Sequence, residues 1–201
     1  MKIALSLGLV AVLATVSSLG AFEKEKVDTS SATTELKSGP QVGDEVGPYE
    51  VVKAAGNEED GVEMGEALCY RCRTGGKPVV MIFARKSDEK LAGLLTALDK
   101  VVAENADKKL VSFVNLIGQE DEAAKKSAEK LIADSKAKHI AVVVPKDQPN
   151  GPEDYKLDPK ADVTVVIYKQ GTVAANHALP EGGLDKDAVK KILDDATKVL
   201  N

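Results

Sequence analysis

The stretch that decides the fold is Pro78-Val79-Val80-Met81-Ile82-Phe83-Ala84. It is apolar without interruption, whereas a strand with one solvated face would alternate apolar and polar residues. The pattern is typical of a strand that is covered on both faces. Such strands occur mainly in parallel sheets, whose strands are joined by crossover connections that usually contain a helix.

The residues that follow agree with this expectation. Ser87 is a candidate N-cap, and apolar residues at helical spacing continue from it to Val102. The stretch Leu110–Ile117 predicts a second buried strand, Asp121–Ser135 a second helix, and Ile140–Val144 a third strand. This order predicts three parallel strands that are joined by right-handed crossovers.

The pattern changes towards the C-terminus. Val163–Tyr168 and Thr172–Ala178 flank a turn that contains glycine, which predicts a β-hairpin. Asp185 is a candidate cap for a last helix, whose apolar positions run to Leu200. At the other end of the domain, Val42–Val52 predicts a turn and a short strand.

This order of elements resembles the thioredoxin-like superfamily, and is most similar to its branch of peroxiredoxins and exported thiol-disulfide oxidoreductases. The resemblance covers residues 42–200 and lies in element order and hydrophobic pattern. It implies an α/β fold, a thioredoxin-like three-layer α/β/α sandwich with a mixed central sheet. The hairpin Val163–Ala178 is then antiparallel to its neighbours. A fold of this kind does not by itself define a function.

The usual active site of that superfamily is missing from the sequence. The family places its reactive cysteine directly after the first long strand, but the matching stretch here, Ala84–Glu89, has no cysteine. The family also has a cis-proline at the start of the hairpin, where this chain has Val163-Thr164. Because a cis bond before a residue other than proline costs about 2.5–4 kcal/mol, we predict a trans peptide before Val163.

The only two cysteines are Cys69 and Cys72, which form a CxxC pair. A disulfide that closes so short a loop stabilises a protein by only about 2 kcal/mol. A chain of this length buries a core without such help, so reactivity is the favoured reason for the pair. Because the pair precedes the strand Pro78–Ala84, we expect it at the N-terminal edge of the sheet, opposite the usual family site.

Three interpretations of the pair remain open. A dithiol that exchanges disulfides or senses redox state is favoured by Arg71 and Arg73, whose charge would lower a thiol pKa, and Cys69 is our candidate for the attacking thiol. A short helix over residues 62–70 would oppose that shift, because Cys69 would lie near its negative end. A passive structural disulfide is the second interpretation. The third is half of a metal site, but zinc takes about four ligands and the sequence has no second cluster. We predict no cofactor and no metal.

The first residues predict export. Residues 1–20 combine Lys2, an apolar run from Ile3 to Val16 and small residues, the pattern of a secretory signal peptide. A secreted protein of the periplasm, cell envelope or extracellular space lies where disulfides persist. Residues 21–41 have almost no apolar content and predict a flexible linker, so the thioredoxin-like domain is expected over residues 42–201. We expect Glu23–Ser38 to pack poorly against that domain.

Charge and composition narrow the range of partners. The net charge is −5, and the lysines are interspersed with acidic residues rather than gathered in a basic patch, which argues against binding of nucleic acid. We expect no stable membrane span once the signal is removed. The predicted partners are protein thiols or disulfides, or a small thiol. The alternative to an exchange protein is a non-catalytic binding or structural module with a passive disulfide.

Overall fold

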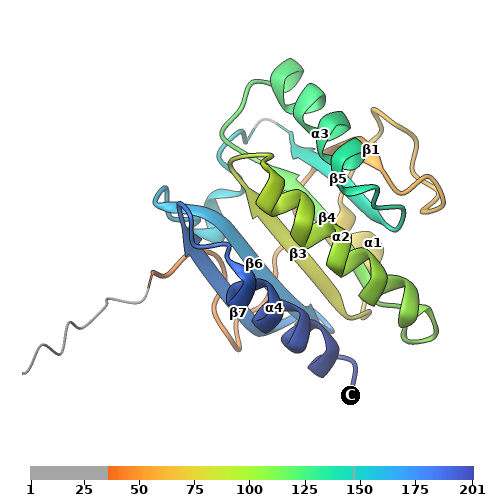
Figure 1. Ribbon diagram of the computed structural model, residues 1–201, viewed down its shortest axis with the longest axis vertical. Helices are drawn as coiled ribbons and strands as arrows, with labels where there is room; N and C mark the ends of the chain where they lie inside the picture. Colours follow the sequence, from red (N-terminus) through yellow and green to blue (C-terminus); the bar gives the residue numbers. More distant parts are fainter. Residues whose placement is uncertain (1–35, 147) are drawn as a thin grey trace, which may run out of the picture. The chain divides into compact units, whose positions relative to one another are not determined.

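The computed structural model describes residues 36–146 and 148–201. Its centre is a sheet with the strand order β2-β1-β5-β4-β3-β6-β7 (Figure 1). The strands are β1 (Val51–Gly56), β2 (Ala67–Leu68), β3 (Val79–Ala84), β4 (Val111–Leu116), β5 (Ile140–Pro145), β6 (Ala161–Lys169) and β7 (Thr172–Pro180). The α-helices are α1 (Tyr70–Thr74), α2 (Glu89–Glu104), α3 (Asp121–Ser135) and α4 (Lys186–Lys198), and η1 (Ala106–Lys108) and η2 (Glu153–Tyr155) are short 3₁₀ helices.

The strand directions confirm the prediction from sequence. β3 is parallel to β4, and β4 is parallel to β5. β6 is antiparallel to β3 and pairs with β7 as a hairpin. β1 adds to the far side of β5 in the antiparallel direction and carries the short β2. The sheet is therefore mixed, with a parallel centre.

The boundaries of the three long helices α2, α3 and α4 agree with the sequence pattern except at one cap. Asp88, rather than Ser87, caps α2, because its carboxylate accepts the backbone N–H of Leu91 at 2.9 Å. Both residues have short polar side chains, and the one whose oxygen reaches that N–H acts as the cap. The range Asp121–Ser135 and the cap at Asp185 are as predicted.

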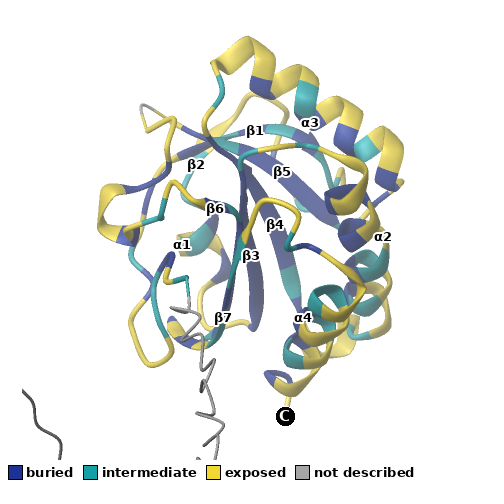
Figure 2. Ribbon diagram, turned by 60° about the vertical axis from the view of Figure 1, so that its left-hand side comes forward, coloured by how far each residue is buried: buried dark blue, intermediate teal, exposed yellow. Residues whose placement is uncertain are grey.

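The three long helices all lie on one face of the sheet. Figure 2 shows α2, α3 and α4 together on one side and α1 on the other. Val80 and Ile82 of β3 face the long helices, where they join the larger apolar core. Val79 and Phe83 face the other way, into a second core that is covered by α1, η2 and irregular segments. The second helical layer of the predicted sandwich is therefore thin.

The folded part begins earlier than the sequence predicts. Ser38 is buried, and its hydroxyl bonds the Thr164 hydroxyl at 2.6 Å and accepts the backbone N–H of Asp158 at 3.0 Å. The Asn176 amide donates to the carbonyls of Ser38 and Pro40, both at 2.9 Å. The linker predicted over residues 21–41 is therefore wrong for residues 36–41, which are fixed by polar contacts. The signal peptide and the rest of the linker lie outside the described residues.

We expect Ser38→Ala to lower the free energy of unfolding by about 1–3 kcal/mol, because it leaves the buried Thr164 hydroxyl without its partner. Urea denaturation of the full chain measures the change. Lys37→Ala, at the exposed neighbouring position, is the matched control and should change stability little. Equal stabilities of the two variants would show that the Ser38 hydroxyl does not contribute to the fold.

Candidate functional site

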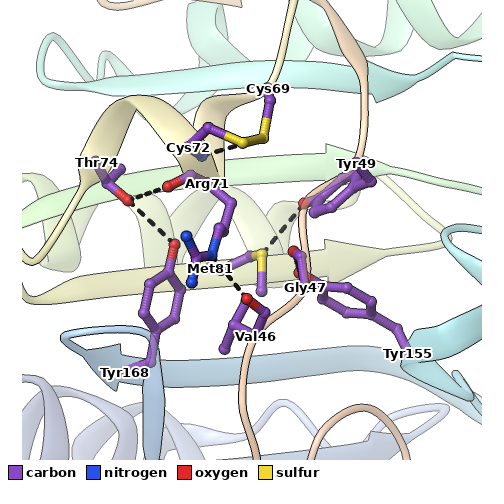
Figure 3. Close-up of a disulfide and its surroundings, with 10 residues drawn as sticks. All are labelled: Val46, Gly47, Tyr49, Cys69, Arg71, Cys72, Thr74, Met81, Tyr155 and Tyr168. Carbon is purple, nitrogen blue, oxygen red and sulfur yellow. Dashed lines mark hydrogen bonds between the residues drawn. A yellow bond between two sulfur atoms is a disulfide. The ribbon is translucent and has the colours of Figure 1, made fainter.

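The two cysteines form a disulfide at the start of α1. The Cα atoms of Cys69 and Cys72 lie 5.2 Å apart, within disulfide reach as predicted. Cys72 is exposed and Cys69 is half-buried. Cys69 is also the N-cap of α1, because its Sγ accepts the backbone N–H of Cys72 at 3.1 Å (Figure 3). The pair is therefore open to solvent on at least one side.

The helix lies after Cys69 and not before it, which corrects one expectation. Residues 62–70 hold the short strand β2 instead of a helix, so Cys69 is at the start of helical structure and not at its negative end. Gly61 and Gly65 have φ angles of 72° and 83°, a left-handed backbone that does not continue into a right-handed helix. Residues 36–68 therefore contain no helix whose negative end would oppose a lowered thiol pKa at Cys69, and that expectation is wrong.

The disulfide lies at the N-terminal edge of the sheet, as predicted. The Thr74 carbonyl accepts the backbone N–H of Lys77 at 3.1 Å, directly before β3 begins. The Thr74 hydroxyl lies 3.4 Å from the hydroxyl of Tyr168. Tyr168 of β6 pairs with Val79, the first residue of β3. Helix α1 is thus fixed to the beginning of β3.

The two arginines of α1 bind backbone carbonyls. Arg71 Nε donates to the carbonyl of Val46 at 2.7 Å, and Figure 3 shows its side chain directed away from the disulfide. Arg73 donates to the carbonyl of Asp60 at 2.8 Å. Both guanidinium groups are thus held by backbone carbonyls, and the expectation that the charge of Arg71 or Arg73 favours a thiolate stays a prediction. The two side chains anchor α1 to other segments.

A buried ion pair joins β1 to the loop that follows it, and a hydrogen bond joins that loop to α1. The fully buried Lys53 ammonium donates to Asp60 Oδ1 at 2.7 Å and to the carbonyls of Asn57 and Val62 at 2.6 and 2.8 Å. These three acceptors satisfy the three ammonium hydrogens. The Tyr70 hydroxyl donates to the other oxygen of Asp60. Burial, together with this hydrogen bond, raises the pKa of Tyr70.

This ion pair was not predicted from the sequence. Lys53 lies between apolar neighbours, and Asp60 lies in an acidic stretch in which solvent-exposed side chains are expected. In a strand whose residues alternate between buried and half-buried, Lys53 falls at a buried position. Because a buried charge needs a partner, this position could have indicated the ion pair.

A cleft of about 500 Å³ lies beside α1. One wall is α1, which contributes Tyr70, Arg73 and Thr74. The rest of its lining mixes apolar residues with charged residues. These residues are Asn57, Glu59, Asp60, Lys77, Val102, Ala103, Ala106, Lys109, Leu110, Val111 and His139. Neither Cys69 nor Cys72 is among the residues that line this cleft, so the cleft and the disulfide lie at different faces of α1.

The position of the usual family site is occupied by other interactions. After β3, Arg85 donates its backbone N–H to the carbonyl of Asp162 at 2.9 Å. The Lys86 ammonium pairs with Asp162 at 3.2 Å and with Glu181. No cis peptide bond occurs in the described part of the chain, so the peptide before Val163 is trans as predicted. The two features that mark the usual family site, a cysteine after β3 and a cis peptide before the hairpin, are therefore not found at this edge of the described sheet.

Two further findings concern the described residues. Within residues 36–146 and 148–201, no group of three or more His, Cys, Asp and Glu side chains could hold a metal ion. The metal half-site therefore finds no further ligands there. No helix in the same ranges is both long enough and apolar enough to cross a membrane.

The fold is thioredoxin-like, as comparison with solved structures confirms. A protein provisionally assigned as thiol:disulfide interchange protein DsbE from Chlorobium tepidum is similar with a TM-score of 0.59 at 15% identity, over 80% of this chain and 99% of that one. AhpC from Mycobacterium tuberculosis is similar with a TM-score of 0.53 at 14% identity, over 79% of this chain and 98% of that one. No protein family and no curated protein matches the sequence.

We expect Asp60→Asn to lower the free energy of unfolding by about 3–5 kcal/mol, because it leaves the Lys53 ammonium buried without its counter-charge. Urea denaturation measures the loss. The exposed neighbour supplies the control Glu59→Gln, which should change stability little.

The double variant Lys53→Met with Asp60→Asn tests the cause. It should recover much of the loss, since an apolar side chain in place of a buried charge removes the unpaired group. Equal losses in the single and double variants would contradict the assignment of a buried ion pair.

Proposed function

We propose that this protein is an exported thiol-disulfide exchange protein that acts through Cys69 and Cys72. The observation that carries the proposal is the disulfide at the beginning of α1, of which Cys72 is exposed to solvent. Two features of the fold support it, namely the hydrogen bond to Cys69 Sγ and the independent anchoring of α1.

The hydrogen bond to sulfur favours Cys69 as the attacking thiol. A hydrogen bond to the charged form of a group favours that form, so the Cys72 N–H stabilises a thiolate at Cys69 after reduction. The thiolate attacks a sulfur of the partner disulfide, forms a mixed disulfide and releases one partner thiolate. The thiolate of Cys72 then attacks Cys69 Sγ and releases the second partner thiolate. The net change is oxidation of the dithiol and reduction of one partner disulfide.

The anchoring of α1 argues against a purely structural disulfide. Arg71 binds the carbonyl of Val46, Thr74 lies against Tyr168, and Tyr70 binds the carboxylate of Asp60. These contacts hold the helix whether or not the cysteines are joined. Since the loop that the disulfide closes is also very short, its loss costs the fold little, about 2 kcal/mol.

Export is part of the proposal and rests on the sequence. The signal-like residues 1–20 support secretion to the periplasm, the cell envelope or the extracellular space. A persistent disulfide agrees with such a compartment. The proposed partners there are protein thiols and disulfides, or a small thiol.

We expect the reduced protein to reduce the disulfides of insulin and to exchange with glutathione. Its reduction potential should be more oxidising than about −300 mV, the range below which structural disulfides lie. The double variant Cys69→Ser with Cys72→Ser should lose the activity. Redox titration and insulin turbidity measure the two properties.

Single variants test the order of attack. Cys72→Ser keeps the proposed attacking thiol and should accumulate a mixed disulfide at Cys69, whereas Cys69→Ser should react more slowly. A potential well below about −300 mV, without insulin reduction, would instead support the alternative, a non-catalytic module with a passive disulfide.

A further inference from the structure

The short strand β2 lies at the edge of the sheet and leads directly into the disulfide. On one side it pairs with β1, where Ala67 lies opposite Val52. The next residues continue the strand, because Cys69 also has an extended backbone, with φ of −96° and ψ of 97°. Residues 67–69 therefore form an edge strand that ends in a sulfur of the disulfide. We call the side of these residues that faces away from β1 the β2 edge.

The hydrogen bonds of this strand show which of its backbone groups lie at the β2 edge. The Glu66 carbonyl accepts the backbone N–H of Lys53 in β1 at 3.0 Å. Because successive residues of a strand direct their backbone groups to opposite sides, the N–H and C=O of Ala67 and the N–H of Cys69 face away from β1. Within residues 36–146 and 148–201, no backbone group of another segment bonds to these three groups. Ala67 is also exposed, so the β2 edge is open to a further strand.

The geometry of an added strand matches the geometry of a disulfide. A segment that pairs with the β2 edge places one of its residues directly opposite Cys69. Opposite residues of antiparallel strands have Cα atoms about 4.5–5.5 Å apart, and their side chains lie on the same face of the sheet. Residues that are joined by a disulfide have Cα atoms about 4.4–6.8 Å apart. A partner cysteine at the opposite position therefore lies at the distance that a mixed disulfide with Cys69 requires.

We propose that the β2 edge binds an extended, unfolded segment of a partner protein as an added β-strand, with a disulfide-bonded cysteine of the partner opposite Cys69. This inference rests on the proposed exchange function and names its substrate class. The Cys69 thiolate attacks the sulfur opposite it, and the second partner sulfur leaves as a thiolate. Cys72 then displaces the partner, so that the dithiol is oxidised and the partner disulfide is reduced to two thiols.

The size of the β2 edge favours such a substrate over a second copy of the chain. Three residues bury far less surface than the roughly 1,200 Å² or more of a stable interface between proteins. A substrate needs only brief pairing, since the mixed disulfide then holds it covalently. The exposed side chain of Ala67 is a single methyl group, so recognition depends on the main chain and tolerates many partner sequences.

The first test changes the backbone of Ala67 in the reduced full chain. Ala67→Pro removes the outward N–H, which an edge strand tolerates because that N–H takes no part in the sheet. Ala67→Val is the matched control, because it keeps the N–H and suits a strand. The substrates are the disulfide-linked dimer of an unstructured peptide with one cysteine, and bis(2-hydroxyethyl) disulfide, which has no peptide backbone.

We expect Ala67→Pro to lower the second-order rate constant for the peptide disulfide about two- to tenfold, as the loss of one hydrogen bond predicts. Its rate constant for bis(2-hydroxyethyl) disulfide should equal that of the wild type, and Ala67→Val should react with both disulfides as the wild type does. The second test keeps the wild-type chain and N-methylates the peptide at one residue at a time. Because alternate residues of an added strand face β2, methylation should slow the reaction at alternate positions only.

The outcomes separate this inference from the proposed function. If both disulfides are reduced, but neither Ala67→Pro nor N-methylation slows the reaction of the peptide, exchange stands and strand addition is overturned. If sedimentation shows a dimer of the reduced chain that Ala67→Pro dissociates, a second copy occupies the β2 edge and strand addition of a substrate is again overturned. If neither disulfide is reduced, the exchange function itself fails, and the inference fails with it.

Discussion

One face of the central sheet carries no long helix in the described part of the chain, so other segments must bury its apolar side chains. All three long helices pack on the opposite face (Figure 2). Val79, Met81 and Phe83 of β3 are therefore buried in the second core, to which α1, η2 and the loops contribute the covering residues. A loop that covers a core brings backbone polar groups with it, and these need partners. The covering segments must therefore supply apolar surface and hydrogen bonds together.

Tyrosine meets both requirements, and all four tyrosines of the chain lie in this second core. Tyr155 donates to the carbonyl of Gly47, and Tyr49 donates to the side chain of Asn115 at the inner face of β4. Tyr70 and Tyr168 make the corresponding contacts on either side of α1. A buried aromatic ring with a hydroxyl at its tip thus fixes each loop at a defined depth. The position of α1, and with it the disulfide, follows from this arrangement.

The sequence predicted the parts of the structure that depend on regular patterns. Continuous apolar runs such as Pro78–Ala84 identified the strands, and helical spacing identified Asp121–Ser135. The N-terminal boundary was missed because Ser38 is held by polar atoms more than 100 residues away, and no local pattern records them. The start of α1 was missed for a related reason. Five residues are too few for a periodicity, and their conformation depends on contacts with distant segments such as Val46.

The sequence predicted the two cysteines of the candidate site and the edge of the sheet at which they lie. It did not predict the charged residues around them. Those charges belong largely to one continuous stretch, residues 57–77, which joins β1 to β3 and passes from the outer part of the sheet to its centre. The dithiol, its helix and much of the cleft beside that helix are thus encoded together, apart from the strands and helices of the larger core. Such a stretch can diverge, or be exchanged for another, while the scaffold beneath it is inherited unchanged. The proposed redox centre is thus a separable part of the chain rather than a property of the fold.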